Sequence, residues 1–121
     1  MIIGIGVDTV GIVRFEQQLA RTPKLRGRLF SEAEGQLSIP SLAARFAAKE
    51  ALIKALGDSG GLTWPDMEVR RNALRAPEFV PTPGLLAALE ARGADRIHLS
   101  MTHDTGIATA FVIVERGGAA A

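Results

Sequence analysis

Cysteine is absent from this chain of 121 residues, which excludes disulfides, zinc–thiolate sites and a thiol nucleophile. Histidine is scarce: His98 and His103 are the only two, so a metal site built from several imidazoles is excluded. No apolar run approaches the ~20 residues of a membrane-spanning helix. Residues 1–7 lack the basic start and long apolar stretch of a signal peptide. We therefore expect a cytoplasmic protein that does not enter a membrane.

A strong excess of one charge is also lacking, because 14 Lys and Arg residues oppose 13 Asp and Glu residues. This balance does not indicate a nucleic-acid-binding protein. The content of 47% hydrophobic and 22% charged residues is typical of a folded globular protein. The length suits a single domain over residues 1–121, in which the glycine and alanine residues at 117–121 are expected to form a flexible tail.

The segment Ile2–Val10 alternates between larger side chains and glycines, as expected for a strand. The side chains at positions 3, 5, 7 and 9 share one face, and Gly4, Gly6 and Asp8 share the other. We expect a core under the first face and open space along the Asp8 face, since glycine in a strand often marks close approach of a ligand or another backbone. A tight strand–helix contact is the alternative.

Residues 41–56 are predicted to form the main helix, capped by Ser41 and ended by Gly57. At ~100° per residue its leucine, isoleucine and phenylalanine side chains form one apolar stripe, and Arg45 and Lys49 fall inside it. A cation rarely lies in such a stripe without an anion or a subunit interface to receive it. Glu50 and Lys54 lie off the stripe, where an ordinary surface ion pair would explain them.

The remaining elements are shorter. We expect helices at 12–21, 31–39 and 85–92, a strand at 67–71 and an irregular connection over 72–83 that has room for a short edge strand at 79–80. Strands at 97–102 and 107–115 form a closing hairpin. Ser31 and Glu34 have the spacing of a capping box. Strands at both ends with helices between them predict an α+β fold, with a small antiparallel or mixed sheet packed against helices.

Two acidic residues, Asp8 and Glu50, are the best candidates for a functional site. Carboxylate oxygens are ligands that Mg²⁺ prefers, and flanking ammonium groups such as Lys49 and Lys54 can neutralise a bound phosphate. His103 stands at the edge of the predicted hairpin turn, where a turn or capping role is the simpler interpretation.

Three segments resemble the holo-acyl-carrier-protein synthase family of 4′-phosphopantetheinyl transferases, in its short, trimeric branch. They are residues 3–10 with Arg14-Phe15 downstream, residues 45–57, and residues 98–104. The resemblance is poor over residues 58–83, where Leu74-Arg75-Ala76-Pro77 replaces the glycine-arginine/lysine-proline turn usual in the family. It implies transfer of the phosphopantetheine group of coenzyme A to a serine of an acyl carrier protein, with release of adenosine 3′,5′-bisphosphate, in fatty acid biosynthesis.

The resemblance also implies roles for individual residues. Asp8 and Glu50 would hold Mg²⁺ and, with it, the diphosphate of coenzyme A. Glu50 and Lys54 would be the catalytic residues, with Glu50 as the base, either directly or through a metal-bound water. The coenzyme contacts would come from Asp8, Arg45, Lys49, Lys54 and His103, with Arg45 and His103 at the 3′-phosphate and adenylate end. The protein would be a homotrimer whose active sites lie between subunits.

The basic residues Arg14, Arg21 and Lys24 allow two interpretations. Such a cluster is commonly a solvated face, but the resemblance implies that it binds the acidic carrier protein. Two other classes of function remain open. A non-catalytic coenzyme A or nucleotide-binding module would not need both carboxylates. A magnesium-dependent phosphohydrolase would need a further acidic cluster to position water, and none lies near either motif.

Overall fold

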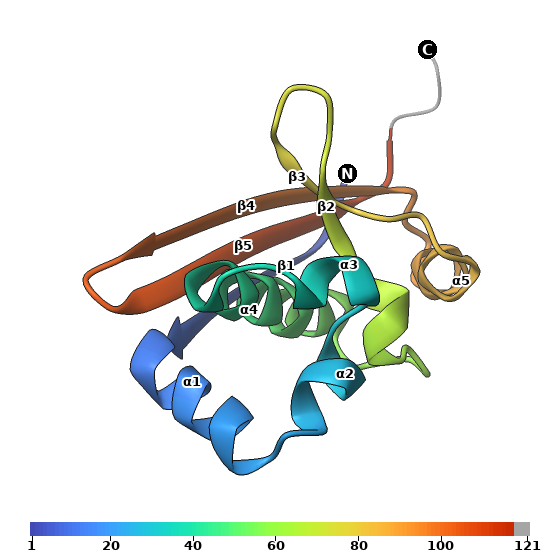
Figure 1. The fold of residues 1–121 in the computed structure, drawn as a ribbon. Helices are drawn as coiled ribbons and strands as arrows, with labels where there is room; N and C mark the ends of the chain where they lie inside the picture. The colour runs from blue at the N-terminus through green and yellow to red at the C-terminus, as the bar shows by residue number, and fades with distance from the viewer. Residues whose placement is uncertain (118–121) are drawn as a thin grey trace.

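The computed structural model describes residues 1–117 and has an α+β fold, which confirms the predicted class (Figure 1). Of the tail predicted over 117–121, residues 118–121 lie outside the described residues, and the Gly117 N–H donates to Oδ1 of Asp95. Along the chain, the elements are β1 (Ile2–Gly11), α1 (Ile12–Arg21), α2 (Leu25–Leu29), α3 (Glu32–Gly35), α4 (Ile39–Leu56), the short 3₁₀ helix η1 (Trp64–Met67), β2 (Val69–Arg71), β3 (Pro77–Phe79), α5 (Pro83–Ala91), β4 (Arg96–Asp104) and β5 (Ile107–Glu115).

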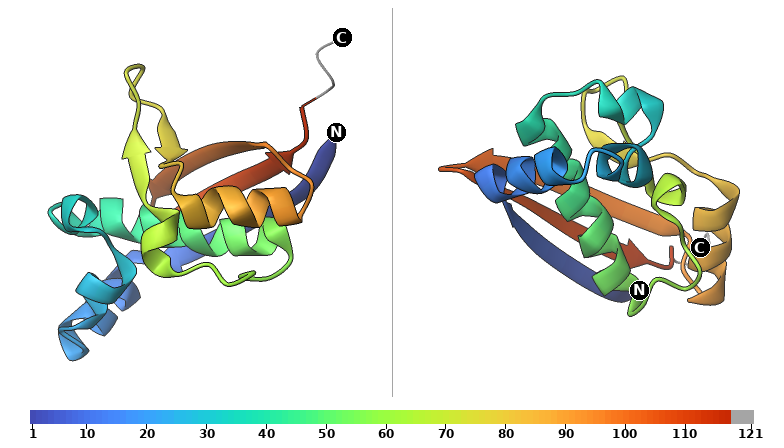
Figure 2. Two further views of the ribbon diagram at one scale, coloured as in Figure 1. Left: turned by 90° about the vertical axis from the view of Figure 1, so that its right-hand side faces the viewer. Right: turned by 60° about the horizontal axis from the view of Figure 1, so that its bottom comes forward.

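The main sheet has three antiparallel strands in the order β1-β5-β4. The predicted closing hairpin is therefore confirmed, with β4 continuing to Asp104. Helix α4 crosses one face of this sheet, and α5 lies at one end of the sheet (Figures 1 and 2). The core lies between α4 and the sheet and includes Leu52, Val112 and Val114, none of which is exposed.

The predicted core face of β1 is wrong. Gly4 and Gly6 face α4, and a Cβ added to either would lie 1.9 Å from a carbonyl oxygen, that of Ala55 or Ala51 respectively. The isoleucine at position 5 is 59% exposed on the other face. The glycines admit the backbone of a helix rather than a ligand, which is the strand–helix contact considered as the alternative.

Helix α4 begins at Ile39, two residues before the predicted start, because Ser38 is its N-cap and Pro40 is accommodated in the first turn. Its predicted end is confirmed: Gly57 has a left-handed backbone with φ of 93° and donates its N–H to carbonyls of the last turn. Within residues 1–117, no helix combines the length and apolar character needed to cross a bilayer.

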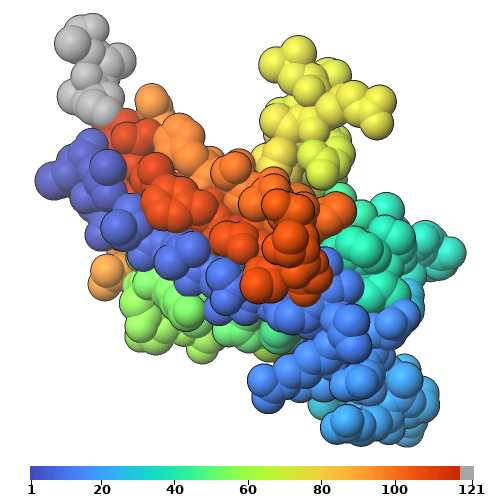
Figure 3. All heavy atoms as spheres, turned by 90° about the vertical axis from the view of Figure 1, so that its left-hand side faces the viewer, coloured from blue at the N-terminus to red at the C-terminus, as the bar shows by residue number. Residues whose placement is uncertain are grey.

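The segment between α1 and α4 differs from the prediction. Helix α2 was not predicted, and the helix predicted over 31–39 is limited to α3, although its capping box between Ser31 and Glu34 is present. The strand predicted over 67–71 is confirmed as β2, although it is limited to residues 69–71, and it pairs in a hairpin with β3, a short strand within the connection predicted over 72–83. This hairpin stands out from the body of the molecule, in yellow in Figure 3.

Candidate active site

A cavity of about 280 Å³ lies where β1, α1 and α4 meet. Asp8 of β1, Arg14 of α1 and Glu50 of α4 line it, so the structure brings together the two acidic residues singled out from the sequence. The short distance between β1 and α4 at the glycines allows this convergence. We call this the carboxylate cavity; its other lining residues are Thr9, Val10, Gly11, Phe15, Gln18 and Phe46.

Lys54 contacts Asp8 directly. Its Nζ lies 3.0 Å from Oδ1 of Asp8 and 3.1 Å from the carbonyl oxygen of Val7. Burial raises the pKa of Glu50, and the Asp8 carboxylate raises it further, whereas Lys54 acts in the opposite direction. Two carboxylates that disfavour each other's charge would be stabilised by a cation bound between them.

Asp8 and Glu50 are suitable ligands for Mg²⁺. This ion commonly keeps several waters and is held by one or two carboxylates together with substrate phosphates. Among residues 1–117, no group of three histidine or acidic side chains could enclose a metal ion. Two carboxylates are a donor set that fits a metal shared with a phosphate-bearing ligand.

Arg45 and His103 lie together at a different cavity, of about 50 Å³, which Arg71 also lines. We call this the basic cavity. Arg45 and Glu50 are five positions apart on α4, which separates them by roughly 140° around the helix. The two cavities share no lining residue. The remaining residues of the basic cavity are Ser41, Ala44, Met101 and Thr102.

The burial of Lys49 disagrees with its predicted contact to coenzyme A. Its side chain has no exposed surface, and Nζ donates to Oε1 of Glu34 at 2.7 Å and to the carbonyl oxygen of Leu29 at 2.8 Å. The ammonium also lies 5.1 Å from the centre of the Phe30 ring. Burial lowers the pKa of Lys49, and the hydrogen bond to Glu34 opposes that shift. The cation found in the apolar stripe therefore has its anion within the same chain.

Glu34 holds several segments together through this pair. Its carboxylate also accepts the N–H groups of Ser31 at 3.1 Å and Val69 at 2.9 Å. One buried ion pair thus connects α4 with the N-terminus of α3, the end of α2 and the first residue of β2. The sequence identified Glu34 only as a capping residue, because nothing in its local spacing shows a partner 15 residues away.

The predicted carrier-binding residues lie on or just after α1. Phe15 and Leu19 bury one side of this helix, which leaves Arg14 and Arg21 exposed, and Lys24 is exposed in the following turn. None of these three cations forms an ion pair within the described part of the chain. They are therefore free to attract an anionic partner.

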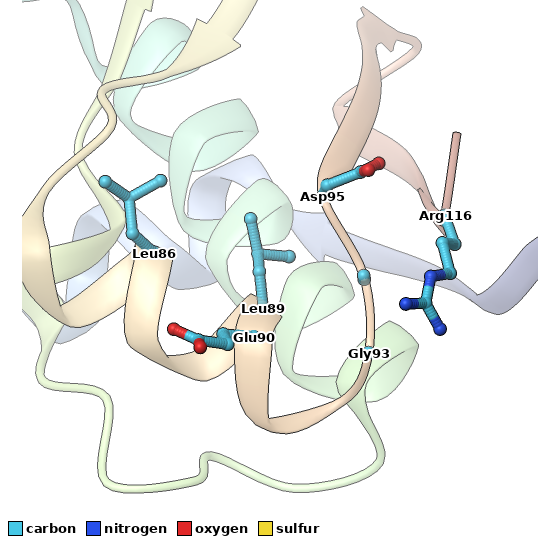
Figure 4. Close-up of a pocket in the computed structure, with 7 residues that line it drawn as sticks. Leu86, Leu89, Glu90, Gly93, Asp95 and Arg116 are labelled. Carbon is cyan, nitrogen blue, oxygen red and sulfur yellow. The ribbon is translucent and has the colours of Figure 1, made fainter. Parts of the chain in front are cut away.

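A further cavity shares no lining residue with the carboxylate cavity or the basic cavity. It measures about 360 Å³ and lies between α5 and the start of β4 (Figure 4). Leu86 and Leu89 supply its apolar wall, and Glu90, Asp95 and Arg116 lie at its edge. Its charged residues are of both signs, and none of the predicted functional residues lines it. We therefore do not include this cavity in the candidate active site.

Comparison with known proteins agrees with this arrangement. The 4′-phosphopantetheinyl transferase superfamily matches residues 4–111. The protein named holo-[acyl-carrier-protein] synthase from Leifsonia xyli subsp. xyli is 58% identical over 116 residues, covering 96% of this chain and 98% of that protein. The protein of the same name from Clavibacter sepedonicus is 57% identical over 119 residues, covering 98% and 100%.

Solved structures agree as well. The crystal structure of holo-[acyl-carrier-protein] synthase from Neisseria meningitidis has a TM-score of 0.88 at 34% identity, covering 96% of this chain and 100% of that one. The Helicobacter pylori synthase, solved in complex with coenzyme A, has a TM-score of 0.80 at 30% identity, covering 92% and 99%. This chain belongs to the 4′-phosphopantetheinyl transferase superfamily.

Proposed function

We propose that this protein is a holo-[acyl-carrier-protein] synthase. It transfers 4′-phosphopantetheine from coenzyme A to a serine of an acyl carrier protein. The convergence of Asp8 and Glu50 at the carboxylate cavity, with Lys54 bonded to Asp8, is the observation that carries this proposal. High identity to synthases over nearly the whole chain supports the same reaction.

In the transfer step, the serine oxygen of the carrier forms a bond to the phosphorus that bears pantetheine. The bond from that phosphorus to the bridging oxygen breaks, and adenosine 3′,5′-bisphosphate leaves. Glu50 accepts the serine proton, a role favoured by a pKa that burial has raised. When coenzyme A is bound with its diphosphate beside Asp8, Lys54 neutralises negative charge on that diphosphate.

Asp8 and Glu50 together would hold Mg²⁺, which supplies positive charge to the diphosphate oxygens as charge develops on them. Arg14 lines the same cavity from α1, so a carrier bound to the basic face of this helix would present its serine close to both carboxylates. Arg21 and Lys24 extend that basic face. Their charges would speed encounter with an acidic carrier and orient it.

We also propose a homotrimer whose active sites lie between subunits. Two observations support it. The face of the sheet that points away from α4 carries an apolar patch on the paired strands β1 and β5. In this patch Ile5 is 59% exposed, Val7 50% and Phe111 43%. The carboxylate and basic cavities of one chain face different sides of α4, so a second copy can supply one half of each site.

Mass spectrometry of an apo carrier protein incubated with this protein, coenzyme A and Mg²⁺ tests the reaction. The carrier should gain the mass of phosphopantetheine, and Asp8→Ala or Glu50→Ala should abolish the gain. Unmodified carrier after incubation with several bacterial carrier proteins, or full activity in both variants, would contradict the proposal.

Mixed oligomers test the shared site. Activity should partly return when inactive Asp8→Ala and His103→Ala chains are combined, because some sites then contain both wild-type residues. A mixture of Asp8→Ala and Lys54→Ala chains is the matched control: these residues touch within one chain, so no mixed site is complete. Equal recovery in both mixtures, or a fully active monomer, would refute sharing.

A further inference from the structure

The chain between α1 and α4 runs through residues 22–38, which we call the connecting segment (Figure 1). It contains α2, with five residues, and α3, with four. An isolated helix shorter than ~12–15 residues is at best marginally stable in water. The connecting segment therefore depends on contacts with the rest of the chain for its position.

Hydrogen bonds attach this segment to one buried ion pair, that of Glu34 and Lys49. Nζ of Lys49 donates to the carbonyl oxygen of Leu29, at the end of α2, and to Oε1 of Glu34 in α3. The other oxygen of Glu34 accepts the N–H of Val69, at the start of β2. In the part of the chain that the structure describes, the remaining hydrogen bonds of the segment lie within it or join it to the adjoining turns of α1 and α4. The polar attachment of α2 and α3 to more distant elements therefore runs through the Glu34–Lys49 pair.

Apolar packing buries the segment without fixing its position as tightly. Leu29 and Phe30 are buried in the cluster that also contains Phe15 of α1. Burial of apolar surface is non-directional, so it tolerates small displacements. A hydrogen bond requires a short distance and a favourable angle, and Nζ of Lys49 lies 2.7 Å from Oε1 of Glu34. The ion pair therefore determines where α2 lies relative to α4.

Lys24, which is predicted to bind the carrier, is positioned by this arrangement. It immediately precedes α2, and its exposed side chain forms no ion pair within residues 1–117. Leu29 ends the same five-residue helix, so the bond from Lys49 to the Leu29 carbonyl oxygen restrains the position of Lys24 as well. Displacement of α2 would therefore move this cation.

Arg14 is positioned by different contacts. It lies on α1, whose first N–H, that of Ile12, donates to the carbonyl oxygen of Gly106 at 2.9 Å. Phe15, the next residue of α1, stacks on Phe46 of α4 with 5.4 Å between the ring centres. Neither contact involves the Glu34–Lys49 pair. The basic face therefore has one cation whose position depends on the pair and one whose position does not.

We propose that Glu34 and Lys49 are positioning residues for carrier binding. Their ion pair holds α2 so that Lys24 meets an acidic group of the carrier, although neither buried side chain can touch the carrier itself. This inference rests on the proposed function for the identity of the partner. Lys49 directly precedes Glu50 on α4, so one helix carries both a candidate Mg²⁺ ligand and the anchor of α2. The pair thereby aligns part of the carrier-binding face with the carboxylate cavity.

Calorimetry of the double variant Glu34→Gln/Lys49→Met tests this, with a bacterial apo carrier protein and, separately, with coenzyme A and Mg²⁺. Removing both charges together leaves no unpaired buried charge, and glutamine keeps an oxygen that can accept the Val69 N–H. The Kd for the carrier should rise by about two- to five-fold, as expected for the loss of one exposed charge contact, and the Kd for coenzyme A should not change. In hydrogen exchange, the amides of residues 25–35 should lose protection while those of α4 keep it.

Two single changes show whether the pair acts through Lys24. In the otherwise wild-type protein, Lys24→Ala and Arg14→Ala should each weaken carrier binding. In the double variant, Lys24→Ala should have little further effect, because α2 no longer holds this cation in place. Arg14→Ala is the matched control and should keep its full effect in the double variant. A general loss of stability would not distinguish the two cations.

A full effect of Lys24→Ala in the double variant would overturn the inference, as would equal weakening for the carrier and coenzyme A. Faster exchange over residues 25–35 with unchanged carrier affinity would also overturn it. If the double variant does not fold, Glu34→Asp takes its place: it keeps the charge, draws the carboxylate back by one methylene, and should again reduce the effect of Lys24→Ala alone.

Binding requires no transfer, so this inference and the proposed function fail separately. A carrier that the wild-type protein binds in this way but does not modify would refute the proposed function and leave the positioning role standing. Normal transfer with a full effect of Lys24→Ala in the double variant would refute the positioning role alone. A wild-type protein that binds no carrier would refute both.

Discussion

The buried ion pair between Glu34 and Lys49 should dominate the stability of this chain among its charged residues. Both side chains are almost fully buried, and Nζ of Lys49 lies 2.7 Å from Oε1 of Glu34. Removing one partner leaves an uncompensated buried charge, which costs about 3–5 kcal/mol. For a chain of 121 residues this corresponds to a fall in Tm of roughly 12–20 °C.

A double-mutant cycle isolates the interaction. Glu34→Gln and Lys49→Met should each destabilise strongly, and the double variant should lose much less than the sum, giving a coupling free energy of at least about 2 kcal/mol. Urea unfolding followed by circular dichroism measures this, at one protein concentration because assembly shifts apparent stability. The exposed Arg70–Glu78 pair is the control, expected to couple by about 0.2–1 kcal/mol.

A coupling free energy for Glu34 and Lys49 no larger than that of the exposed pair would refute this reasoning. The same variants separate the two roles considered for Lys49. Because Lys49 is enclosed within the chain, Lys49→Met should bind coenzyme A normally at temperatures where it remains folded. Loss of binding in a fully folded Lys49→Met protein would restore the coenzyme contact predicted from the sequence.

Three further predictions concern the site. Gly6→Ala should destabilise the fold by more than about 2 kcal/mol and reduce transfer, because the added Cβ would lie 1.9 Å from a main-chain oxygen of α4. Gly11→Ala is the control, since its Cβ would meet only an ordinary contact at 3.8 Å. Thermal unfolding measures the stability of both variants, and carrier modification measures their transfer activity. Arg14→Glu with Arg21→Glu should raise KM for the carrier far more than KM for coenzyme A, and equal effects in steady-state assays would contradict carrier binding. Without Mg²⁺, the wild-type protein should lose stability relative to Glu50→Gln as the pH rises from 4.5 through the raised pKa of Glu50, because the folded state favours the protonated carboxyl. Urea unfolding measures the free energy of unfolding of both proteins. If the difference between the two free energies does not vary between pH 4 and 8, the prediction is wrong.

Local patterns were sufficient to predict the strands of the main sheet, the end of α4 at Gly57 and the burial of Arg45 and Lys49. Each depends on periodicity or on one residue's backbone preference. The face of β1 that meets the core could not be inferred, because its apolar side is left uncovered within one chain and its glycine side is covered by a helix from a distant segment. Likewise, Glu34 and Arg71 reach their partners only through the tertiary fold.

The pairing of β1 with β5 determines when the site can form during folding. Ile2 pairs with Glu115 and Gly11 with Ile107, so the strand that carries Asp8 is made first and its partner about one hundred residues later. Closing so long a loop is entropically costly and slow. Until β5 is synthesised, the apolar surface of α4 has only part of its cover and is exposed to aggregation. Because β1 and α4 carry the two carboxylates, we expect the pair to be held stably only once β5 has paired with β1.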